Sequence, residues 1–145
     1  MSRLKTLLSL AQASTIIDAA LAAGRANNFM PLTVVVLDNG GHLIALKRED
    51  GSGIMRTDIA IGKAWGALGL GLSSRAIGAN NTDRPAFLNA LAAASDGRCI
   101  PVAGGVLIND AQGETIGAVG ISGDNSDNDE HCALEGIKAA GLTAG

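Results

Sequence analysis

The sequence is poor in aromatic side chains and has no run of basic residues, and these two absences exclude one broad class of function. Among 145 residues there are two phenylalanines, one tryptophan and no tyrosine. Lysine and arginine number 11 against 14 aspartates and glutamates, which gives a formal net charge of −3. Proteins that bind nucleic acids need clustered cations to neutralise phosphates, and aromatic rings on which unpaired bases stack. We therefore expect no nucleic-acid partner.

Long apolar runs and closely spaced cysteines are also lacking. No stretch approaches the roughly 20 apolar residues that span a bilayer. Polar residues from Gln12 onward interrupt the apolar N-terminal segment, unlike a secretory signal. Cys99 and Cys132 have no metal-type spacing, and a chain of this length does not depend on disulfides. We expect a cytoplasmic protein with free thiols, no membrane partner and no metal site.

What the sequence has in quantity is glycine and small aliphatic residues. Glycine occurs 20 times, and 47% of the residues are hydrophobic. A chain with this apolar content can bury enough surface to fold, and 145 residues suit a single domain, residues 1–145. We expect a core of small aliphatic side chains in which backbones approach closely at glycines.

Apolar periodicity divides the chain into helices and two hairpins. Apolar residues three or four apart predict helices, and short β-branched runs predict strands. Turns rich in glycine, asparagine and aspartate begin at Asp38 and Asn109 and join the strands in pairs. The predicted helices are residues 10–28, 56–70, 85–94 and 128–140, and the predicted strands are residues 32–37, 42–48, 102–109 and 115–122. This order favours an α+β fold with one mainly antiparallel sheet flanked by helices.

An acidic segment, residues 124–130, invites comparison with a calcium-binding loop. Its polar residues imitate the first ligand positions of an EF-hand, but Asp129 stands where that loop needs glycine, and a strand precedes it. The favoured interpretation is a helix start, with Asp127 placed to cap the last helix and Glu130 three residues further on.

Lys63 stands on the glycine-bearing face of the predicted helix 56–70, where a charged side chain needs an explanation. The glycines of this face indicate that something packs closely against it. A lysine there snorkels to solvent, pairs with an acid or meets an anionic ligand. We expect a buried pair with Glu49 or Asp50 in the preceding loop, and contact with a ligand carboxylate is the alternative.

The two histidines have no catalytic partner next to them in the sequence. His42 begins a strand after a glycine pair, so we expect it on the surface. His131 and Cys132 are neighbours on a predicted helix, about 100° apart, and cannot easily share one ligand. Structural or solvent-facing roles are favoured for both, with axial ligation or acid–base work as the alternative.

Six short segments occur in an order that resembles a known family. They are residues 35–43 (VVLDNGGHL), 47–51 (KREDG), 59–64 (IAIGKA), 101–106 (PVAGGV), 117–123 (GAVGISG) and 129–130 (DE). Together, from about Leu10 to Leu142, they closely resemble the GlcG/HbpS family, often described as haem-binding or haem-degrading, which includes the C-terminal domain of PduO-type corrinoid proteins. The resemblance implies a five-stranded antiparallel sheet flanked by helices, in dimers or larger rings, commonly octamers. Oligomerisation would also explain the glycine-rich, aliphatic helix faces.

Where haem ligation is described in this family, a histidine in the first helix can supply it. This sequence has no histidine before Pro31. If the first helix supplies an axial ligand for a haem iron, as the resemblance implies, only Met30 at the end of that helix is left for this role.

Three functions from different classes are consistent with these features. The first is an oligomeric protein that binds a small ligand, haem or a related tetrapyrrole. Its expected ligand-binding residues are Asp50, Gly51, Lys63, Gly104 and Gly105. The second is a cytoplasmic catabolic enzyme that acts on a small anionic metabolite by proton transfer or hydrolysis, in which Lys63 holds the anion and Asp50 or His131 is the base. The third is an accessory oligomeric protein without chemistry.

Overall fold

The computed structural model describes residues 1–145 and contains five helices and five strands. The helices are α1 (Leu10–Ala26), α2 (Met55–Leu70), α3 (Ser74–Ala79), α4 (Pro85–Ala94) and α5 (Ser126–Ala139). The strands are β1 (Thr33–Asp38), β2 (Leu43–Arg48), β3 (Gly105–Asn109), β4 (Thr115–Ser122) and β5 (Thr143–Ala144). None of the helices combines the length and the apolar character that crossing a bilayer requires.

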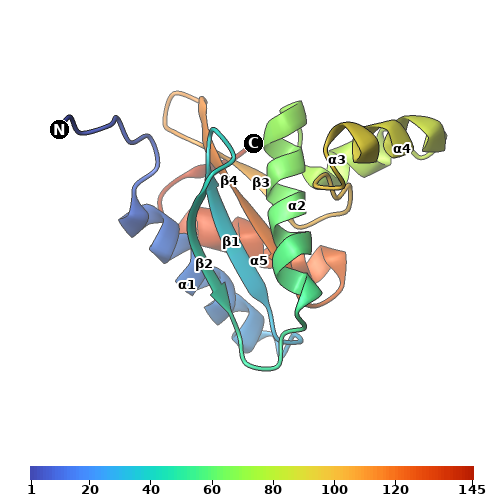
Figure 1. Ribbon diagram of the computed structural model, residues 1–145. Helices are drawn as coiled ribbons and strands as arrows, with labels where there is room; N and C mark the ends of the chain where they lie inside the picture. The colour runs from blue at the N-terminus through green and yellow to red at the C-terminus, as the bar shows by residue number, and fades with distance from the viewer.

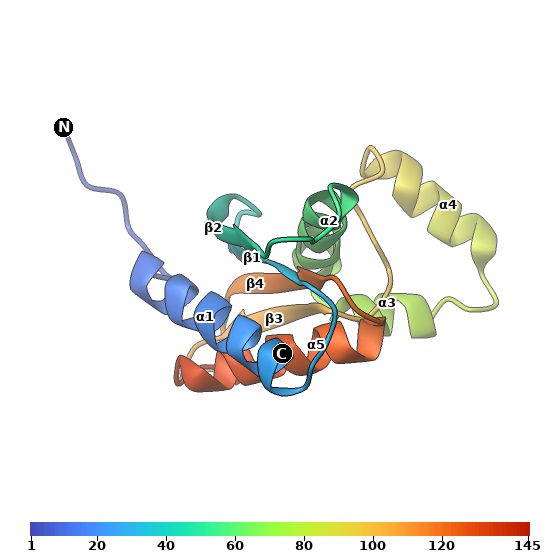
Figure 2. The same ribbon diagram turned by 90° about the horizontal axis from the view of Figure 1, so that it is seen from below.

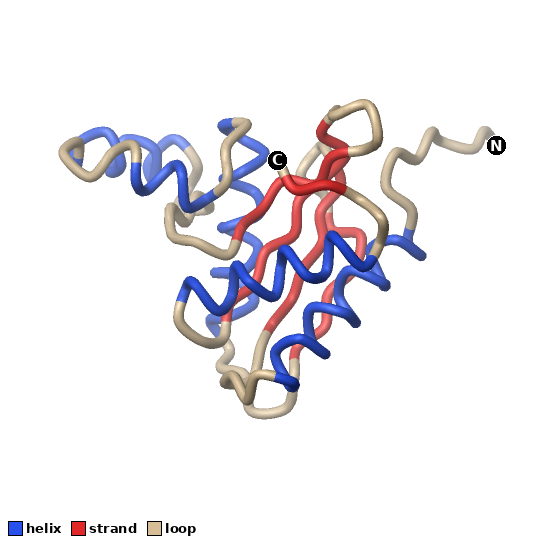
Figure 3. The backbone as a smooth tube through the Cα atoms, turned by 180° about the vertical axis from the view of Figure 1, so that it is seen from behind, coloured by secondary structure: helices blue, strands red, loops and turns tan.

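The five strands form one antiparallel sheet with helices on both faces. The strand order is β2-β1-β4-β3-β5, and every neighbouring pair is antiparallel. Helix α2 runs across one face of the sheet, as Figure 1 shows, while α1 and α5 lie beside each other on the opposite face (Figures 2 and 3). The expected α+β architecture with a five-stranded antiparallel sheet is therefore confirmed.

Strand β1 shows how a central strand serves two cores. Val34 and Val36 belong to the cluster of 16 buried residues under α1 and α5, whereas Val35 and Leu37 belong to the cluster of 7 under α2. Successive side chains of a strand point to opposite faces, so a strand that is buried on both faces is apolar throughout. The buried members of both clusters are aliphatic residues and one cysteine, without any aromatic ring.

Glycine allows α2 to lie directly on β4. A Cβ atom at Gly120 would collide with the carbonyl group of Ala60 in α2. On α2 itself, a Cβ atom at Gly62 would collide with Ile100 and with the carbonyl group of Arg98. The glycine-bearing face of α2 is therefore covered by the chain's own sheet and by the segment that leads into β3.

Most element bounds agree with the prediction, and the differences have local causes. Helix α4 and strand β4 have the bounds expected for residues 85–94 and 115–122. Helix α5 begins earlier than expected, because the side chain of Asn125 accepts the main-chain N–H of Asn128 and caps it. The expected cap by Asp127 is therefore wrong, and its carboxylate instead pairs with Arg75.

The sequence does not predict α3 and β5. Helix α3 has six residues and β5 has two, which is too short for apolar periodicity to reveal. Strand β3 begins at Gly105 rather than at residue 102, and Ser74 at the start of α3 marks this boundary. Its hydroxyl accepts the main-chain N–H of Gly105 at 2.8 Å and donates to the carbonyl of Val102 at 2.7 Å.

Substituting the contact glycine on β4 tests this packing. Gly120→Ala is expected to lower the free energy of unfolding by about 1–3 kcal/mol, because the added methyl group pushes α2 away from the sheet. Gly69→Ala is the matched control, since its nearest neighbour would be a Trp65 ring atom 3.9 Å away. The control should stabilise the protein by up to about 1 kcal/mol through helix propensity. Urea denaturation followed by circular dichroism measures both, and equal effects would contradict the packing argument.

Candidate functional site

Lys63 carries its ammonium group into the interior of the protein. Its Nζ donates a hydrogen bond of 2.9 Å to the main-chain oxygen of Ile121 in β4 and another of 2.9 Å to Oδ2 of Asp129 in the first turn of α5. The side chain of Lys63 is 2% exposed and that of Asp129 is 1% exposed. One buried ion pair therefore joins the helix on one face of the sheet to a helix on the other face.

Two glycines at the start of β3 make room for this side chain. Gly104 has a φ of +117°, and a Cβ atom there would lie 2.9 Å from Nζ of Lys63 and 2.8 Å from the carbonyl oxygen of Ile121. At Gly105 a Cβ atom would collide with the carbonyl group of Lys63. The structure thus brings together Lys63, Gly104 and Gly105, three of the predicted ligand residues, as a packed junction that lines none of the four cavities.

Burial shifts both partners of the ion pair towards their neutral forms. Desolvation lowers the pKa of Lys63 and raises the pKa of Asp129, although the mutual hydrogen bond and the partner's charge act in the opposite direction in each case. The attraction between the two groups therefore offsets only part of the free energy required to remove them from water.

The expectation that Glu49 or Asp50 pairs with Lys63 is wrong. The carboxylate of Glu49 lies 2.9 Å from Nε of Arg25, and it also accepts the main-chain N–H of the residue before β1. These contacts hold the loop after β2 against the end of α1. The actual partner, Asp129, is 66 residues from Lys63 in the chain, so no local spacing could reveal it.

Asp50 and Gly51 lie in a separate part of the structure. No hydrogen bond or ion pair joins them to the Lys63 junction, and Asp50 borders an open recess of about 470 Å³. The lining residues are Arg25, Pro31, Arg48, Glu49 and Asp50. Two arginines and two acids leave this recess without net charge, so it has no net attraction for an anion.

His131 and Cys132 face different surroundings. His131 is exposed, and its ring meets that of Phe29 edge-on, with the centroids 6.4 Å apart. Cys132 lies in the core under α1, where desolvation and then the charge of Asp129 raise the pKa of its thiol to about 11. Neither side chain forms a hydrogen bond with Lys63, so the candidate base and the candidate anion holder are not assembled into one site.

The acidic segment before and within α5 is engaged by neighbouring groups. Asp124 accepts the main-chain N–H of Met30 at 2.6 Å, which helps to lower its pKa, and Asp127 and Glu130 both pair with Arg75 of α3. No group of three or more histidine, cysteine, aspartate or glutamate side chains is arranged to hold a metal ion.

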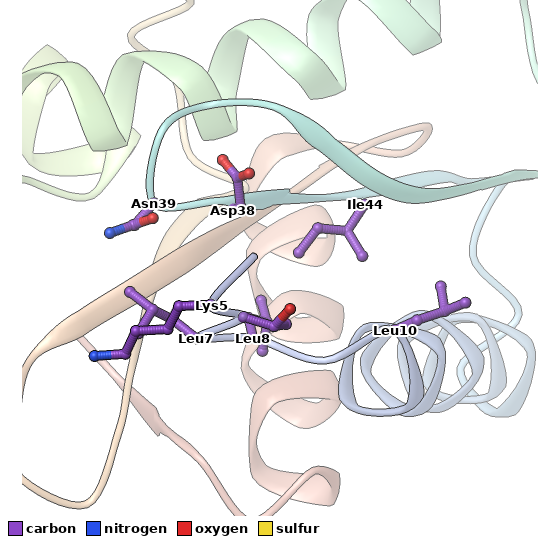
Figure 4. Close-up of a pocket in the computed structure, with 8 residues that line it drawn as sticks. Lys5, Leu7, Leu8, Leu10, Asp38, Asn39 and Ile44 are labelled. Carbon is purple, nitrogen blue, oxygen red and sulfur yellow. The ribbon is translucent and has the colours of Figure 1, made fainter. Parts of the chain in front are cut away.

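A cleft of about 540 Å³, which the sequence does not predict, lies where the N-terminal segment passes the first hairpin. Figure 4 shows Lys5 and Asn39 at one end of this cleft and Leu10 and Ile44 at the other. The lining residues are Lys5, Thr6, Leu7, Leu8, Leu10, Asp38, Asn39 and Ile44. The cleft therefore has an aliphatic wall and a polar end. The apolar residues that precede the predicted first helix are the feature of the sequence that could have indicated this cleft.

The turn of the first hairpin holds His42 against Asp38, which borders this cleft. Nδ1 of His42 lies 3.2 Å from Oδ1 of Asp38, and the same oxygen accepts the main-chain N–H groups of Gly40 and His42. Burial acts to raise the pKa of Asp38, but these N–H donors and the imidazole hold it below its usual value. The His42 side chain is 81% exposed, which confirms the expected surface position and leaves its second ring nitrogen accessible.

Comparisons with known proteins place this fold in a family. Residues 8–138 match the family described as haem-degrading protein HbpS-like. The chain is also 34% identical over 119 residues to protein GlcG of Escherichia coli strain K12, which covers 81% of this chain and 83% of GlcG. The chain therefore belongs to the HbpS-like family, and GlcG is a curated relative within it. The resemblance inferred from the six sequence segments is confirmed.

Solved structures share the architecture. A PduOC complex with haem superposes with a TM-score of 0.83 at 23% identity, covering 94% of this chain and 96% of the other. Klebsiella pneumoniae protein ORFY gives a TM-score of 0.85 at 26% identity, covering 97% and 94%. HbpS gives a TM-score of 0.78 at 23% identity, covering 95% and 92%. The arrangement of helices and strands is thus shared with proteins that differ from this chain at the majority of their aligned positions.

Breaking the buried ion pair from either side is expected to destabilise the fold. Lys63→Met leaves a buried carboxylate and Asp129→Asn leaves a buried ammonium, and each should cost about 3–5 kcal/mol of unfolding free energy. The double variant should lose much less than the sum of the two, because no charge is left unpaired. Denaturant titration of the four proteins measures the coupling energy.

The exposed pair of Lys47 and Asp18 is the matched control for this cycle. Both side chains are more than half exposed. Lys47→Met and Asp18→Asn should each change the unfolding free energy by less than about 1 kcal/mol, with little coupling. Additive losses at Lys63 and Asp129 would show that the two groups do not depend on each other.

Proposed function

We propose that this protein binds haem or a related tetrapyrrole in the cleft between the N-terminal segment and the first hairpin. Family membership supports the ligand class, because the family is described by haem degradation and one structure with the same fold is a PduOC complex with haem. The observation that carries the location is that one cleft has an aliphatic wall and a lysine, and that Asp38, one of its lining residues, holds the imidazole of His42, which does not itself line the cleft.

The size and lining of this cleft suit a large, flat and mainly apolar molecule. Its volume of about 540 Å³ lies within the range of roughly 300–1,000 Å³ that is usual for small-molecule sites. Two of the other cavities have volumes of about 160 and 190 Å³, and the third, of about 470 Å³, has no hydrophobic lining. The leucines of the N-terminal segment and Ile44 would contact the faces of the macrocycle.

His42 is the residue that would coordinate the iron. A histidine that ligates a metal usually donates its other ring N–H to a carboxylate, which fixes the orientation of the ring. Asp38 already holds Nδ1 of His42 in this way, and Nε2 is left free. Met30, the ligand that the first helix could offer, lies at the opposite end of β1. Bound haem supplies iron coordination and redox chemistry that none of these side chains provides alone.

The polar end of the cleft suits the acidic edge of a haem. Haem carries two propionate groups, and Lys5 lies with Asn39 at that end of the cleft (Figure 4). An ammonium group there would pair with a propionate and orient the macrocycle with its apolar edge towards Leu10 and Ile44. In this proposal Lys63, Gly104 and Gly105 act on the fold and have no contact with the ligand.

A haemin titration of the histidine variants tests the proposal. The wild type should show a saturable Soret shift at about one haemin per subunit. His42→Ala should lose the spectrum of the coordinated iron. Asp38→Asn should weaken haemin binding by about 10–100-fold, because the asparagine oxygen still accepts the N–H groups of the turn but carries no negative charge to orient the imidazole. His131→Ala is the matched control, since the chain has only two histidines, and it should bind as the wild type does.

Metal-free protoporphyrin IX separates coordination from apolar burial. Binding of this probe should be unaffected by His42→Ala and weakened by Ile44→Asp. If His42→Ala and the wild type give the same haemin spectrum, the proposed location is wrong. If the wild type gives no saturable binding of either probe, the proposed ligand class is wrong, and the enzymatic and accessory functions become the better candidates.

A further inference from the structure

The segment that precedes α1 stands apart from the rest of the protein. Residues 1–6, the arm, are exposed and belong to no helix or strand, and Figure 2 shows the arm projecting beyond α1. None of the arm residues takes part in a hydrogen bond or an ion pair. Lys5 and Thr6 nevertheless line the cleft at the first hairpin, and Leu4, immediately before them, is 90% exposed. An apolar side chain beside an apolar wall is therefore left without a partner.

The arm is fixed to the body at Leu8. This side chain is 2% exposed within the core under α1 and α5, and a Cβ atom at Gly117 would lie 2.8 Å from its Cδ2. From Ser9 onward the chain is held by a capping box, because the main-chain N–H of Ser9 donates to Oε1 of Gln12 and the Ser9 hydroxyl accepts the N–H of Gln12. Everything before Leu8 can therefore swing about one anchored point without disturbing the core.

The chemistry along the arm alternates between cationic and apolar. Its central residues are Arg3, Leu4 and Lys5, and the arm contains no acid although the whole chain has a net charge of −3. In an extended chain successive side chains point in opposite directions, so Arg3 and Lys5 share one side and Leu4 takes the other. Such a segment matches a ligand in which two neighbouring anionic groups border an apolar ring.

The cleft itself offers the arm no free carboxylate. Asp38 is the single acid among the residues that line it. Oδ1 of Asp38 already accepts the main-chain N–H groups of Gly40 and His42 and lies 3.2 Å from Nδ1 of His42. The cations of the arm therefore lack a counterion until an anionic ligand enters the cleft.

From this arrangement we infer that the arm closes over the bound tetrapyrrole, with Arg3 pairing with the second propionate; this inference rests on the proposed function. An arm that crosses the macrocycle beside its propionates places Arg3 and Lys5 over the two carboxylates and Leu4 over the ring. Arg3 precedes Leu8 by five residues, which span up to about 17 Å when extended, so the swing has the necessary reach. Closure excludes water and slows release, and it selects tetrapyrroles with two adjacent carboxylates.

Limited proteolysis tests the closure. Trypsin cuts after Arg3 and after Lys5, so mass spectrometry can follow the loss of the arm from the intact protein. Saturating haemin should slow this loss about tenfold or more, because cleavage requires the open form of the arm. A synthetic peptide of residues 1–9, digested with and without haemin, is the control for any effect of haemin on trypsin itself.

Charge removal on either partner tests the pairing. Arg3→Gln should weaken haemin binding by about 2–5-fold, as is usual for an exposed ion pair, and should leave the binding of haemin dimethyl ester unchanged because its propionates are uncharged. Arg48→Gln is the matched control, since Arg48 is exposed, forms no ion pair and lies at the far end of the first hairpin.

Leu4→Ser tests the apolar part of the closure. It should speed the dissociation of haemin and of the dimethyl ester alike by about tenfold, because less apolar area is buried when the arm closes. Leu4 is exposed in the free protein, so this variant should unfold at the same denaturant concentration as the wild type.

The outcomes separate this inference from the proposed function. If haemin gives a saturable Soret shift but the arm is cleaved at an unchanged rate, or if Arg3→Gln affects haemin and its ester equally, the closure is wrong and haem binding stands. An arm that resists trypsin in the absence of any ligand would also overturn the inference. If haemin does not bind to the wild type, the proposed function fails and the closure fails with it.

Discussion

The structure depends on one buried ion pair that holds its two helical layers in register across the sheet. Lys63 belongs to the helix on one face, Asp129 begins a helix on the other, and the carbonyl of Ile121 lies between them. Removing a hydrogen-bonding partner of the buried ammonium strongly destabilises the folded state, because it leaves an unpaired charge in the interior. The glycines at positions 104 and 105 follow from this constraint, since any side chain there would occupy the space that the ammonium and the helix backbone fill.

This constraint explains why the candidate site and the packed junction are different places. A lysine flanked by glycines has the composition of a ligand pocket, but here the glycines admit the chain's own groups and leave no space. The clefts lie at the periphery instead, where loops and the N-terminal segment pass the sheet. A functional surface built on segments outside the core can vary without disturbing the ion pair, which suits a family whose members share a fold at low sequence identity.

The sequence predicts the fold far better than the site. Helix periodicity, the β-branched run of β1 and the two glycine-rich turns each act over a few residues, so the α+β architecture and eight of its ten elements can be read directly. Asp129 becomes the partner of Lys63 because the chain leaves β4 and begins α5 beside the ammonium group. No local sequence pattern encodes this long-range contact. Asp38 and His42 are only four residues apart in a hairpin that the sequence predicts, but the passage of the N-terminal segment beside that hairpin is a long-range contact that no local pattern encodes.

The two margins of the sheet are protected in different ways, and this has a consequence for how the protein avoids misassembly. At one margin the two-residue β5 pairs with Ile108 and Asn109 at the end of β3, and the hydroxyl of Ser74 bonds to Gly105 at the start of that strand. At the other, β2 ends in Lys47 and Arg48, whose charges oppose the addition of a foreign strand. Neither border offers a long, flat template, so the chain is guarded against fibril growth by strand addition even though its β1 and β4 segments are among the most apolar in the sequence.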